Sequence, residues 1–223
     1  MTAHTRFPQG LYGVTPQWDD TDRLIAAIEL AAANGMRSLQ LRRKNIPAAA
    51  LRAQAERVQA ACRALGVVFI VNDDWQLALA IGADGVHIGR DDADLQAVRD
   101  AVGPDMIVGT SCYNDIELAR TALAQGADYV AYGAMYPSAT KPDAVRASLD
   151  LLQRTRALLA SYDTPRPALV AIGGITSANA AAVAAAGADA LAVITGLFEV
   201  DDIAAAARSL ADTVAHATPT PTN

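Results

Sequence analysis

The sequence is poor in cysteine and aromatic residues, and it contains no block of basic residues. Its two cysteines, Cys62 and Cys112, lie far apart in the chain, so they form neither a metal-binding spacing nor a disulfide framework, and a protein with reduced thiols is expected. Aromatic residues make up only 5% of the chain, and the formal net charge is −6. These values disfavour binding to nucleic acids and to anionic membranes.

The chain also lacks a long apolar run and the pattern of a secretory leader. No stretch of about 18 uninterrupted apolar residues occurs, so no transmembrane helix is expected. The first residues, "MTAHTRFPQG", do not have the charged and then apolar layout of a signal peptide. We therefore expect a cytoplasmic protein. The sequence leaves its oligomeric state open, a homo-oligomer included.

Short apolar runs, separated by helical patterns, fill the chain almost from end to end. Most of them are continuous rather than alternating, which is typical of strands buried on both faces of a parallel sheet. Eight such runs occur, at residues 11–15, 38–42, 67–72, 85–89, 106–112, 128–135, 168–175 and 190–198.

The segments between these runs have the signals of helices. In the first of them, Thr21 is a candidate N-cap and Gly35 a candidate for the residue that follows the helix. The tripeptide Gly-Ala-Asp occurs three times, beginning at Gly82, Gly126 and Gly187, and each time it joins a helical pattern to the next apolar run. Glycine at such a joint can adopt a positive φ and end the helix.

Eight such β–α units in a chain of 223 residues predict an α/β fold, a compact (β/α)₈ TIM barrel. We expect a single domain over residues 1–216 and a short disordered tail over the Pro/Thr-rich residues 217–223. The alternative is a doubly wound open sheet, which would need a glycine-rich phosphate fingerprint in its first βα turn. The turn here is "TPQWDDTD", without that fingerprint.

Polar and small residues collect directly after the predicted strands, which is where the functional residues of a barrel lie. Cations follow the second and sixth strands, carboxylates follow the third and fourth, and small hydroxyl residues and glycines follow the fifth to the eighth. In chain order these candidates are Gln40, Arg42, Lys44, Asn72, Asp73, Asp74, His87, Arg90, Asp91, Asp92, Thr110, Ser111, Ser138, Thr140, Lys141, Gly173, Gly174, Thr195 and Gly196.

Each of these groups, taken alone, has a plain structural explanation. The "NDD" that begins at Asn72 can cap a helix, His87 can be a hydrogen-bonded core histidine, and an Arg or Lys after a strand can simply be solvated. Their convergence on one rim favours function. Lysine, hydroxyl and backbone N–H groups bind phosphate oxygens, and two separated aspartates suit Mg²⁺, which also takes ligands from phosphate and water. The sequence therefore predicts a Mg²⁺-assisted site that holds two phosphorylated groups.

Seven motifs occur in a fixed order along nearly the whole chain: "QLRRK", "VNDD", "ADGVHIGRDD", "GTSC", "GAMYPSATK", "AIGGI" and "AVITG". Together they resemble the thiamine phosphate synthase family, also called thiamine-phosphate pyrophosphorylase. The resemblance implies a transferase of thiamine biosynthesis. It implies that two small-molecule substrates, hydroxymethylpyrimidine pyrophosphate and thiazole phosphate, are joined to thiamine phosphate with release of pyrophosphate, with Mg²⁺ as cofactor.

The resemblance also assigns residues to the pyrimidine pyrophosphate. Asp73 and Asp92 are expected to bind Mg²⁺. The other residues on this side contact the pyrimidine or its pyrophosphate, and they are Gln40, Arg42, Lys44, Asn72, Ser111 and Lys141. Within that set, Arg42, Lys44, Ser111 and Lys141 are expected to act in catalysis. The implied mechanism is dissociative, and positive groups stabilise the charge that grows on the leaving pyrophosphate.

The thiazole phosphate is expected on the other side of the rim. The resemblance assigns it to Ser138 and Thr140, together with Gly174 and the backbone of Ile194 and Thr195. The implied reaction needs little acid–base chemistry, in keeping with a chain that has only three histidines.

The chain departs from the family pattern at three places, and two alternatives to the synthase are considered. Arg90 stands where the family usually has glutamine, Ser138 where it has threonine, and Cys112-Tyr113 where it has Thr-His. A thiazole tautomerase-like isomerase has a similar fold but relies on a histidine at the place of Tyr113. A non-catalytic barrel that binds thiamine phosphate is the other alternative.

Overall fold

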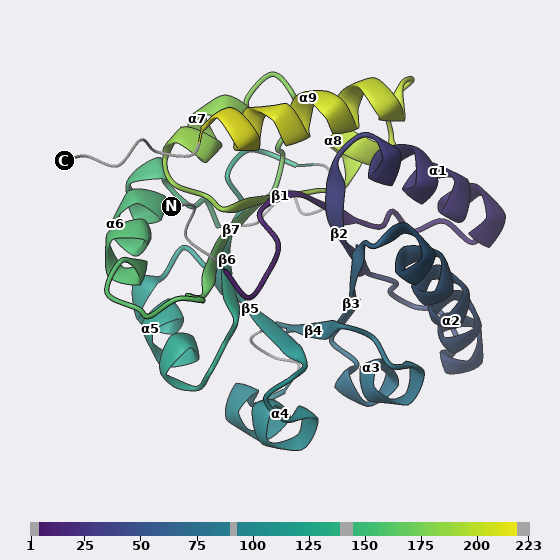
Figure 1. Ribbon diagram of the computed structural model, residues 1–223, viewed down its shortest axis with the longest axis horizontal. Coiled ribbons are helices and arrows are strands. Elements are labelled where there is room, and N and C mark those ends of the chain that lie inside the picture. Colours follow the sequence, from purple (N-terminus) through teal and green to yellow (C-terminus); the bar gives the residue numbers. More distant parts are fainter. Residues whose placement is uncertain (1–4, 90–92, 139–144, 218–223) are drawn as a thin grey trace.

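Eight parallel strands form a closed barrel in the computed structural model, which describes residues 5–89, 93–138 and 145–217 (Figure 1). Each strand pairs with the next, and β8 pairs with β1 to close the ring. The TIM barrel is confirmed, and the doubly wound alternative is wrong. The strands are β1 (Gly10–Val14), β2 (Met36–Leu41), β3 (Val68–Asn72), β4 (Gly85–Ile88), β5 (Ile107–Tyr113), β6 (Tyr129–Tyr132), β7 (Ala168–Ile172) and β8 (Ala190–Val193).

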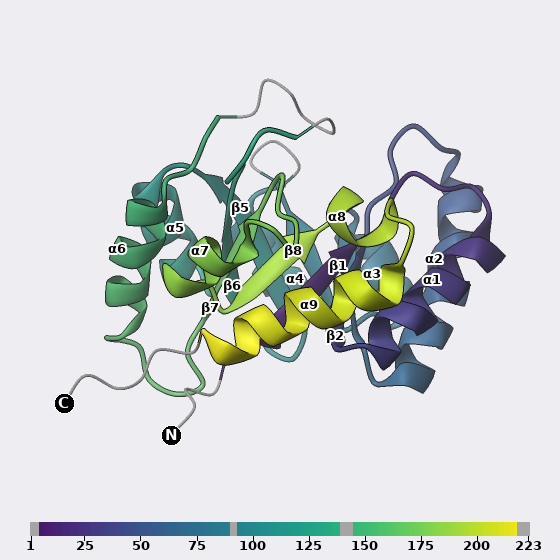
Figure 2. The ribbon, with the colours of Figure 1, turned by 90° about the horizontal axis from the view of Figure 1, so that it is seen from above.

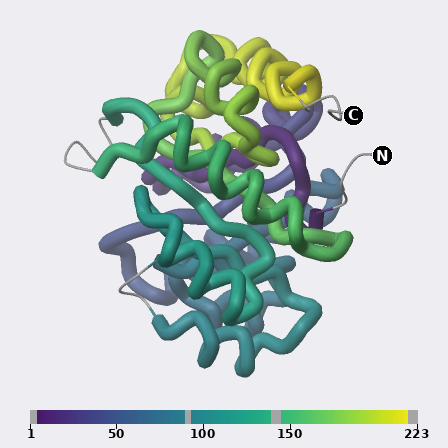
Figure 3. Tube along the Cα trace, turned by 90° about the vertical axis from the view of Figure 1, so that its left-hand side faces the viewer, coloured from purple at the N-terminus to yellow at the C-terminus, as the bar shows by residue number. Residues whose placement is uncertain are grey.

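Helices surround this barrel, as the view along its axis shows (Figure 1). A side view shows the short α8 close to β8, and a third view shows helices of one half of the ring covering the strands behind them (Figures 2 and 3). The helices are α1 (Thr21–Ala33), α2 (Ala48–Leu65), α3 (Trp75–Ile81), α4 (Leu95–Val102), α5 (Ile116–Ala124), α6 (Leu149–Leu159), α7 (Ala180–Ala185), α8 (Thr195–Phe198) and α9 (Ile203–His216). Within the described ranges, no helix combines the length and the apolar character that a membrane crossing requires. Of the predicted tail, residues 218–223 lie outside the described residues.

Aspartates begin most of these helices. The side chain of Asp20, not that of the predicted Thr21, accepts a hydrogen bond from the backbone N–H of Arg23 and caps α1. A carboxylate one residue earlier satisfies an N–H of the first turn, and Thr21 is then the first helical residue. The aspartates that cap later helices in the same way are Asp74, Asp94, Asp115 and Asp202.

Two strand ends differ from the predicted runs. The run 190–198 is not one strand, because β8 ends at Val193 and Thr195 already begins α8. The run 128–135 also ends early, at Tyr132. The backbone N–H of Ala134 donates to the carbonyl of Val145 instead, which turns the chain out of the barrel wall.

Small and aromatic side chains fill the barrel interior. Alanines from β6, β7 and β8 leave room for the rings of Tyr12 and Tyr129, both fully buried. Phe7 comes from the segment before β1 and packs its ring 4.8 Å from that of Tyr12 and 4.3 Å from that of Tyr129. The amino end of the barrel is therefore filled, and the space for a ligand lies toward the carboxyl ends of the strands.

The Gly-Ala-Asp joints fasten the amino ends of the strands. As predicted, Gly82, Gly126 and Gly187 have positive φ values of 67°, 85° and 106°. The aspartate of each joint, Asp84, Asp128 or Asp189, accepts a hydrogen bond from a backbone N–H of the preceding strand in the barrel, at 2.7 to 2.8 Å; the donors are Phe69, Val108 and Leu169.

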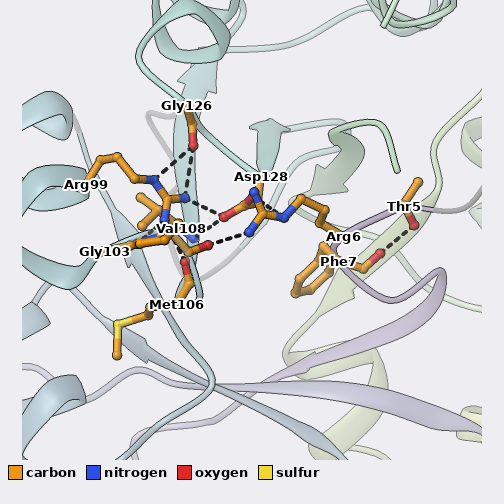
Figure 4. A network of polar contacts seen from close by, with 10 residues as sticks. Thr5, Arg6, Phe7, Arg99, Gly103, Met106, Val108, Gly126 and Asp128 are labelled. Carbon is orange, nitrogen blue, oxygen red and sulfur yellow. Dashed lines mark hydrogen bonds and ion pairs between the residues drawn. The ribbon is translucent and has the colours of Figure 1, made fainter. Parts of the chain in front are cut away.

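Arginines complete two of these joints. Arg99 and Arg6 lie on either side of Asp128, with nitrogen–oxygen distances of 2.5 Å and 3.1 Å (Figure 4). Asp189 accepts from Arg166 through both carboxylate oxygens and also pairs with Arg156. These ion pairs connect neighbouring elements at the end of the barrel opposite to the ligand space.

Candidate active site

A cavity of about 430 Å³ lies at the carboxyl ends of the strands and gathers most of the predicted site residues. Eight of them line it. They belong to β2, β3 and β5 or to the segments that follow β2, β3, β6 and β8, and they are Gln40, Arg42, Lys44, Asn72, Asp73, Ser111, Ser138 and Ile194. Gly174 and Thr195 do not line the cavity, although each directly follows a lining residue, Gly173 or Ile194. Asp92, Thr140 and Lys141, and with them Arg90, lie outside the described residues.

Hydrogen bonds from the segment that follows β1 hold the segment that follows β2 in place. The backbone N–H of Arg42 donates to Oγ1 of Thr15 at 2.9 Å, and Nε2 of Gln17 donates to the carbonyl of Arg42 at 2.8 Å. Oε1 of Gln17 accepts from the backbone N–H of Lys44 at 2.9 Å. Thr15 and Gln17 thus hold the backbone of Arg42 and of Lys44 at the cavity, a role that the sequence analysis missed.

Arg43, between those two cations, has a structural role. Its side chain is only 3% exposed, donates to the carbonyl of Trp18, and pairs with Asp19 at 2.5 Å. Successive side chains of an extended segment point to opposite sides, so Arg42 and Lys44 face the cavity while Arg43 packs against the loop after β1.

The three residues that end β3 divide in a similar way. Asn72 and Asp73 line the cavity, whereas Asp74 caps α3 through the backbone N–H of Leu77 at 2.8 Å. Asp73 has a φ of 66°, in the left-handed region that residues other than glycine adopt uncommonly, and its N–H donates to the carbonyl of His87 at 2.8 Å. Its carboxylate forms an ion pair with the ammonium of Lys44. A strained residue that turns a carboxylate toward a cavity is a feature of functional sites.

The donor chemistry at Asp73 fits a hard cation. Its carboxylate, 24% exposed, and the amide of Asn72 offer oxygen ligands on one wall of the cavity. Mg²⁺ uses one or two carboxylates and takes its other ligands from water and phosphate. The described residues contain no cluster of three metal-ligating side chains, and the second predicted carboxylate, Asp92, is outside them.

Buried hydrogen bonds link two of the predicted residues across the barrel floor. Nε2 of Gln40 donates to the hydroxyl of Tyr12 at 2.9 Å, and that hydroxyl lies 3.0 Å from the hydroxyl of Tyr129. Nδ1 of His87 lies 2.9 Å from the Tyr129 hydroxyl, and Nε2 of His87 lies 2.9 Å from Oγ of Ser111. His87 is therefore a hydrogen-bonded core histidine, which was its plain structural explanation, and it also lines the cavity.

The glycines after β7 permit a close backbone approach on the opposite wall. Gly174 has a φ of 65°, and a Cβ at this position would lie 2.4 Å from the carbonyl oxygen of Pro137. The backbone N–H of Tyr136 donates to the carbonyl of Gly173 at 2.9 Å. The segment that carries Ser138 therefore lies directly against this glycine turn.

A second cavity, of about 500 Å³, lies outside the barrel wall between α4 and α5. Its lining includes Leu95, Leu118 and Ala122, and among the residues predicted to bind substrate it includes only Ser111. Because the cations and the carboxylate line the cavity inside the barrel, that cavity is the candidate active site.

Comparison with known proteins agrees with this geometry. The family model described as thiamine monophosphate synthase matches residues 11–197. The chain belongs to the thiamine monophosphate synthase family. It is 61% identical over 206 residues to a thiamine-phosphate synthase of Bordetella avium, which covers 92% of this chain and 95% of that protein. To a thiamine-phosphate synthase of Chromobacterium violaceum it is 54% identical over 203 residues, 91% of this chain and 95% of the relative.

A solved structure of the same family shares the fold. The thiamine phosphate pyrophosphorylase from Pyrococcus furiosus superimposes with a TM-score of 0.81 at 28% identity, covering 95% of this chain and 98% of the other. The motifs that resemble the thiamine monophosphate synthase family thus lead to the same family as these comparisons.

Proposed function

We propose that this chain catalyses the synthesis of thiamine phosphate in the cytoplasm from two small-molecule substrates, hydroxymethylpyrimidine pyrophosphate and thiazole phosphate. The observation that carries this proposal is that one cavity is lined both by cations and a carboxylate that follow β2 and β3 and by a hydroxyl residue and a glycine from the segments after β6 and β7. Membership of the thiamine monophosphate synthase family supports the same reaction.

The pyrophosphate is assigned to the wall formed by Arg42, Lys44 and Asn72. When the bond between the pyrimidine methylene group and the pyrophosphate breaks, negative charge grows on the leaving oxygen. Cations held at fixed positions stabilise this charge more in the transition state than in the bound substrate, which lowers the barrier. Gln40, which also lines the cavity, is assigned to the pyrimidine end of the same substrate, and Ser111 and Lys141 are assigned to the leaving pyrophosphate.

The thiazole phosphate is assigned to the opposite wall. Ser138 lines this wall beside Gly173 and Ile194, and the adjoining Gly174 and Thr195 add backbone groups. Hydroxyls and backbone N–H groups are suitable ligands for phosphate oxygens. Thr140, in the same loop as Ser138, is assigned to this phosphate as well. The thiazole nitrogen is then placed to capture the pyrimidine cation.

Mg²⁺ is assigned to Asp73 together with Asp92. When bound, the ion supplies positive charge to the pyrophosphate oxygens. The ion pair between Asp73 and Lys44 supports this assignment, because the carboxylate assigned to the metal lies next to the ammonium group assigned to the pyrophosphate.

A turnover assay tests the proposal. Purified protein is mixed with hydroxymethylpyrimidine pyrophosphate, thiazole phosphate and Mg²⁺, and thiamine phosphate and pyrophosphate are quantified together. We expect both products in equal amounts and only with both substrates present. Folded protein that binds thiamine phosphate without forming it would support the non-catalytic alternative, and conversion of a thiazole tautomer without any pyrimidine substrate would support the isomerase.

A further inference from the structure

The hydrogen bonds beneath the cavity form one continuous chain from Gln40 to Ser111. It passes through the hydroxyls of Tyr12 and Tyr129 and the ring of His87, with consecutive donor–acceptor distances of 2.9, 3.0, 2.9 and 2.9 Å. The members in its middle are buried, with exposed fractions of 1% for Tyr12, 0% for Tyr129 and 8% for His87.

The position of its central member is fixed by packing. A Cβ on Gly109 of β5 would lie 1.9 Å from the Tyr129 ring, so this ring occupies the space that a side chain at position 109 would need. Phe7 packs against the same ring from below. The hydroxyl of Tyr129 is thereby held between Tyr12 and His87.

The two phenols in this series of hydrogen bonds, Tyr12 and Tyr129, each carry one proton. Burial raises the pKa of Tyr12 and of Tyr129 well above the ordinary value of 10.0, so both hydroxyls stay neutral. A neutral hydroxyl donates one hydrogen bond and can accept others. The direction of every bond in the chain is therefore fixed once the direction of one bond is known.

Gln40 sets that direction. Its Nε2 can only donate, so the oxygen of Tyr12 accepts this bond. Among the described residues Tyr12 has one other hydrogen-bond partner, Tyr129, and a buried O–H without an acceptor is costly, so Tyr12 donates to Tyr129. The Tyr129 proton then goes to Nδ1 of His87, and the proton on Nε2 of His87 goes to Oγ of Ser111.

We infer that Tyr12, Tyr129 and His87 are positioning residues that make Gln40 a hydrogen-bond acceptor and Ser111 a hydrogen-bond donor toward the ligand. Nε2 of Gln40 is engaged below the cavity, so its carboxamide oxygen remains for the ligand. Ser111 accepts from His87, so its own proton remains for the ligand. The ligand class selected is a heterocycle with an N–H donor above Gln40 and a phosphate-type oxygen above Ser111. This inference rests on the proposed function, whose pyrimidine pyrophosphate substrate is of that class.

The tautomer of His87 tests the direction of the chain without any turnover. A His4→Gln/His216→Gln double variant leaves His87 as the only imidazole, because the chain has three histidines. The ¹⁵N spectrum of the folded, ligand-free protein then reports which ring nitrogen carries the proton. We expect the neutral ring with the proton on Nε2. A ring protonated on Nδ1 alone, or on both nitrogens, would overturn the inference. In the first case the hydrogen bonds from Gln40 to Ser111 would run in the opposite direction, and in the second they would have no single direction.

A pair of tyrosine variants tests the positioning role. Tyr129→Phe interrupts the chain at its centre. Tyr132→Phe, on the same strand, removes an equally buried hydroxyl whose partner is Thr155 on the outer side of the barrel, at 2.9 Å. Tyr129→Phe loses two buried hydrogen bonds, to Tyr12 and to His87, whereas Tyr132→Phe loses one, to Thr155, so the larger loss of thermal stability is expected in Tyr129→Phe. Only Tyr129→Phe should raise the KM for the pyrimidine pyrophosphate, by about threefold to tenfold, while the KM for the thiazole phosphate stays unchanged.

The results separate this inference from the proposed function. Equal kinetics in both variants, or a rise of both KM values together in Tyr129→Phe, would overturn the positioning role while wild-type turnover still supports the function. If Tyr129→Phe does not fold, the His87 tautomer still decides. A wild-type protein that forms no thiamine phosphate yet shows the Nε2–H tautomer would contradict the proposed function and leave the direction of the chain established.

Discussion

Lys44 and Asp73 form an ion pair between the neighbouring ends of β2 and β3, on the wall of the barrel cavity. One is assigned to a pyrophosphate and the other to Mg²⁺, and in this arrangement each neutralises the other. The two side chains are 45% and 24% exposed, and pairs of this kind contribute about 0–1 kcal/mol to stability. Substrate and metal can therefore replace the pair at little cost.

Replacement of the Asp73 carboxylate is expected to weaken metal binding without unfolding the barrel. In Asp73→Asn, the Mg²⁺ concentration for half-maximal turnover should rise by at least about tenfold, because a charged ligand becomes a neutral one. Mn²⁺ binding followed by electron paramagnetic resonance gives the same comparison without turnover. The matched control is Asp74→Asn, since asparagine also caps a helix well. Equal metal affinity in the two variants would contradict the assignment of Asp73.

A second pair of neighbouring aspartates permits the same design. Asp92 is assigned to Mg²⁺ on the resemblance alone, because it lies outside the described residues. Asp92→Asn should lower metal affinity as Asp73→Asn does, whereas Asp91→Asn should keep it. If the two ligands share one ion, the double variant should lose less than the sum of the single losses. If Asp91→Asn lowered the metal affinity and Asp92→Asn kept it, the metal ligand would be Asp91 and not Asp92.

The glycine turn after β7 is expected to control the phosphate wall. In Gly174→Ala, the new Cβ would lie 2.4 Å from the carbonyl oxygen of Pro137 and displace the segment that carries Ser138. We expect the KM for thiazole phosphate to rise more than that for the pyrimidine substrate. Gly66→Ala is the control, because Gly66 has a nearly identical φ of 67° but no atom within 4 Å of its Cβ position. Both variants carry the backbone strain of about 1–2 kcal/mol, and unfolding by urea measures it; an unchanged KM in Gly174→Ala would argue against a phosphate on this wall.

The fold could be predicted from the sequence because continuous apolar runs and glycine joints are local signals. The errors lie where tertiary contacts decide. The run at 190–198 contains α8 because nothing in its apolar pattern distinguishes a strand from the helical turn that begins at Thr195. The choice between Thr21 and Asp20 as the cap is a competition between neighbouring polar side chains that composition alone does not decide.

The candidate site was predictable for residues that directly follow strands and less so for those below them. Asp73 and Lys44 stand out in the sequence because they are charged residues just after apolar runs. Tyr12 and Tyr129 belong to apolar runs in which the positions that face into the barrel and those that face outward look alike. Gln17 supports the site through the backbone of its neighbours, so its side-chain type carried no signal of a site. Such residues become visible only when the register of the barrel is known.

At the amino end, Asp189 is expected to matter for stability and not for activity. Its removal in Asp189→Ala leaves Arg166, which is only 5% exposed, without its carboxylate partner. Loss of one partner of a buried pair costs about 3–5 kcal/mol. Chemical denaturation should show a loss of this size, with kcat of the folded enzyme unchanged. Asp22→Ala, which breaks the exposed pair with Arg57, should cost much less; comparable losses in both variants would mean that burial of the Asp189 cluster adds no stability.

The buried tyrosines are expected to make the fold sensitive to alkaline conditions. Burial raises the pKa of Tyr132 to about 12, and it raises the pKa of Tyr12 and Tyr129 further above the ordinary 10.0. Above pH 10 the unfolded chain loses these protons while the folded protein keeps them, so the folded state binds more protons and the free energy of unfolding falls as the pH rises. Each group contributes at most about 1.4 kcal/mol per pH unit until its folded pKa is reached.

Urea unfolding at a series of pH values from neutral to 11 measures this loss, with tyrosinate absorbance as a second observable. The decline should begin near pH 10, when the unfolded phenols start to ionise, and tyrosinate should form together with unfolding for the buried rings. Tyr132→Phe is the internal control, because it removes one of the three phenols and should make the decline shallower by one group's share. The same slope in wild type and variant would show that Tyr132 ionises as readily in the folded barrel as in the unfolded chain, and that its burial does not hold the proton.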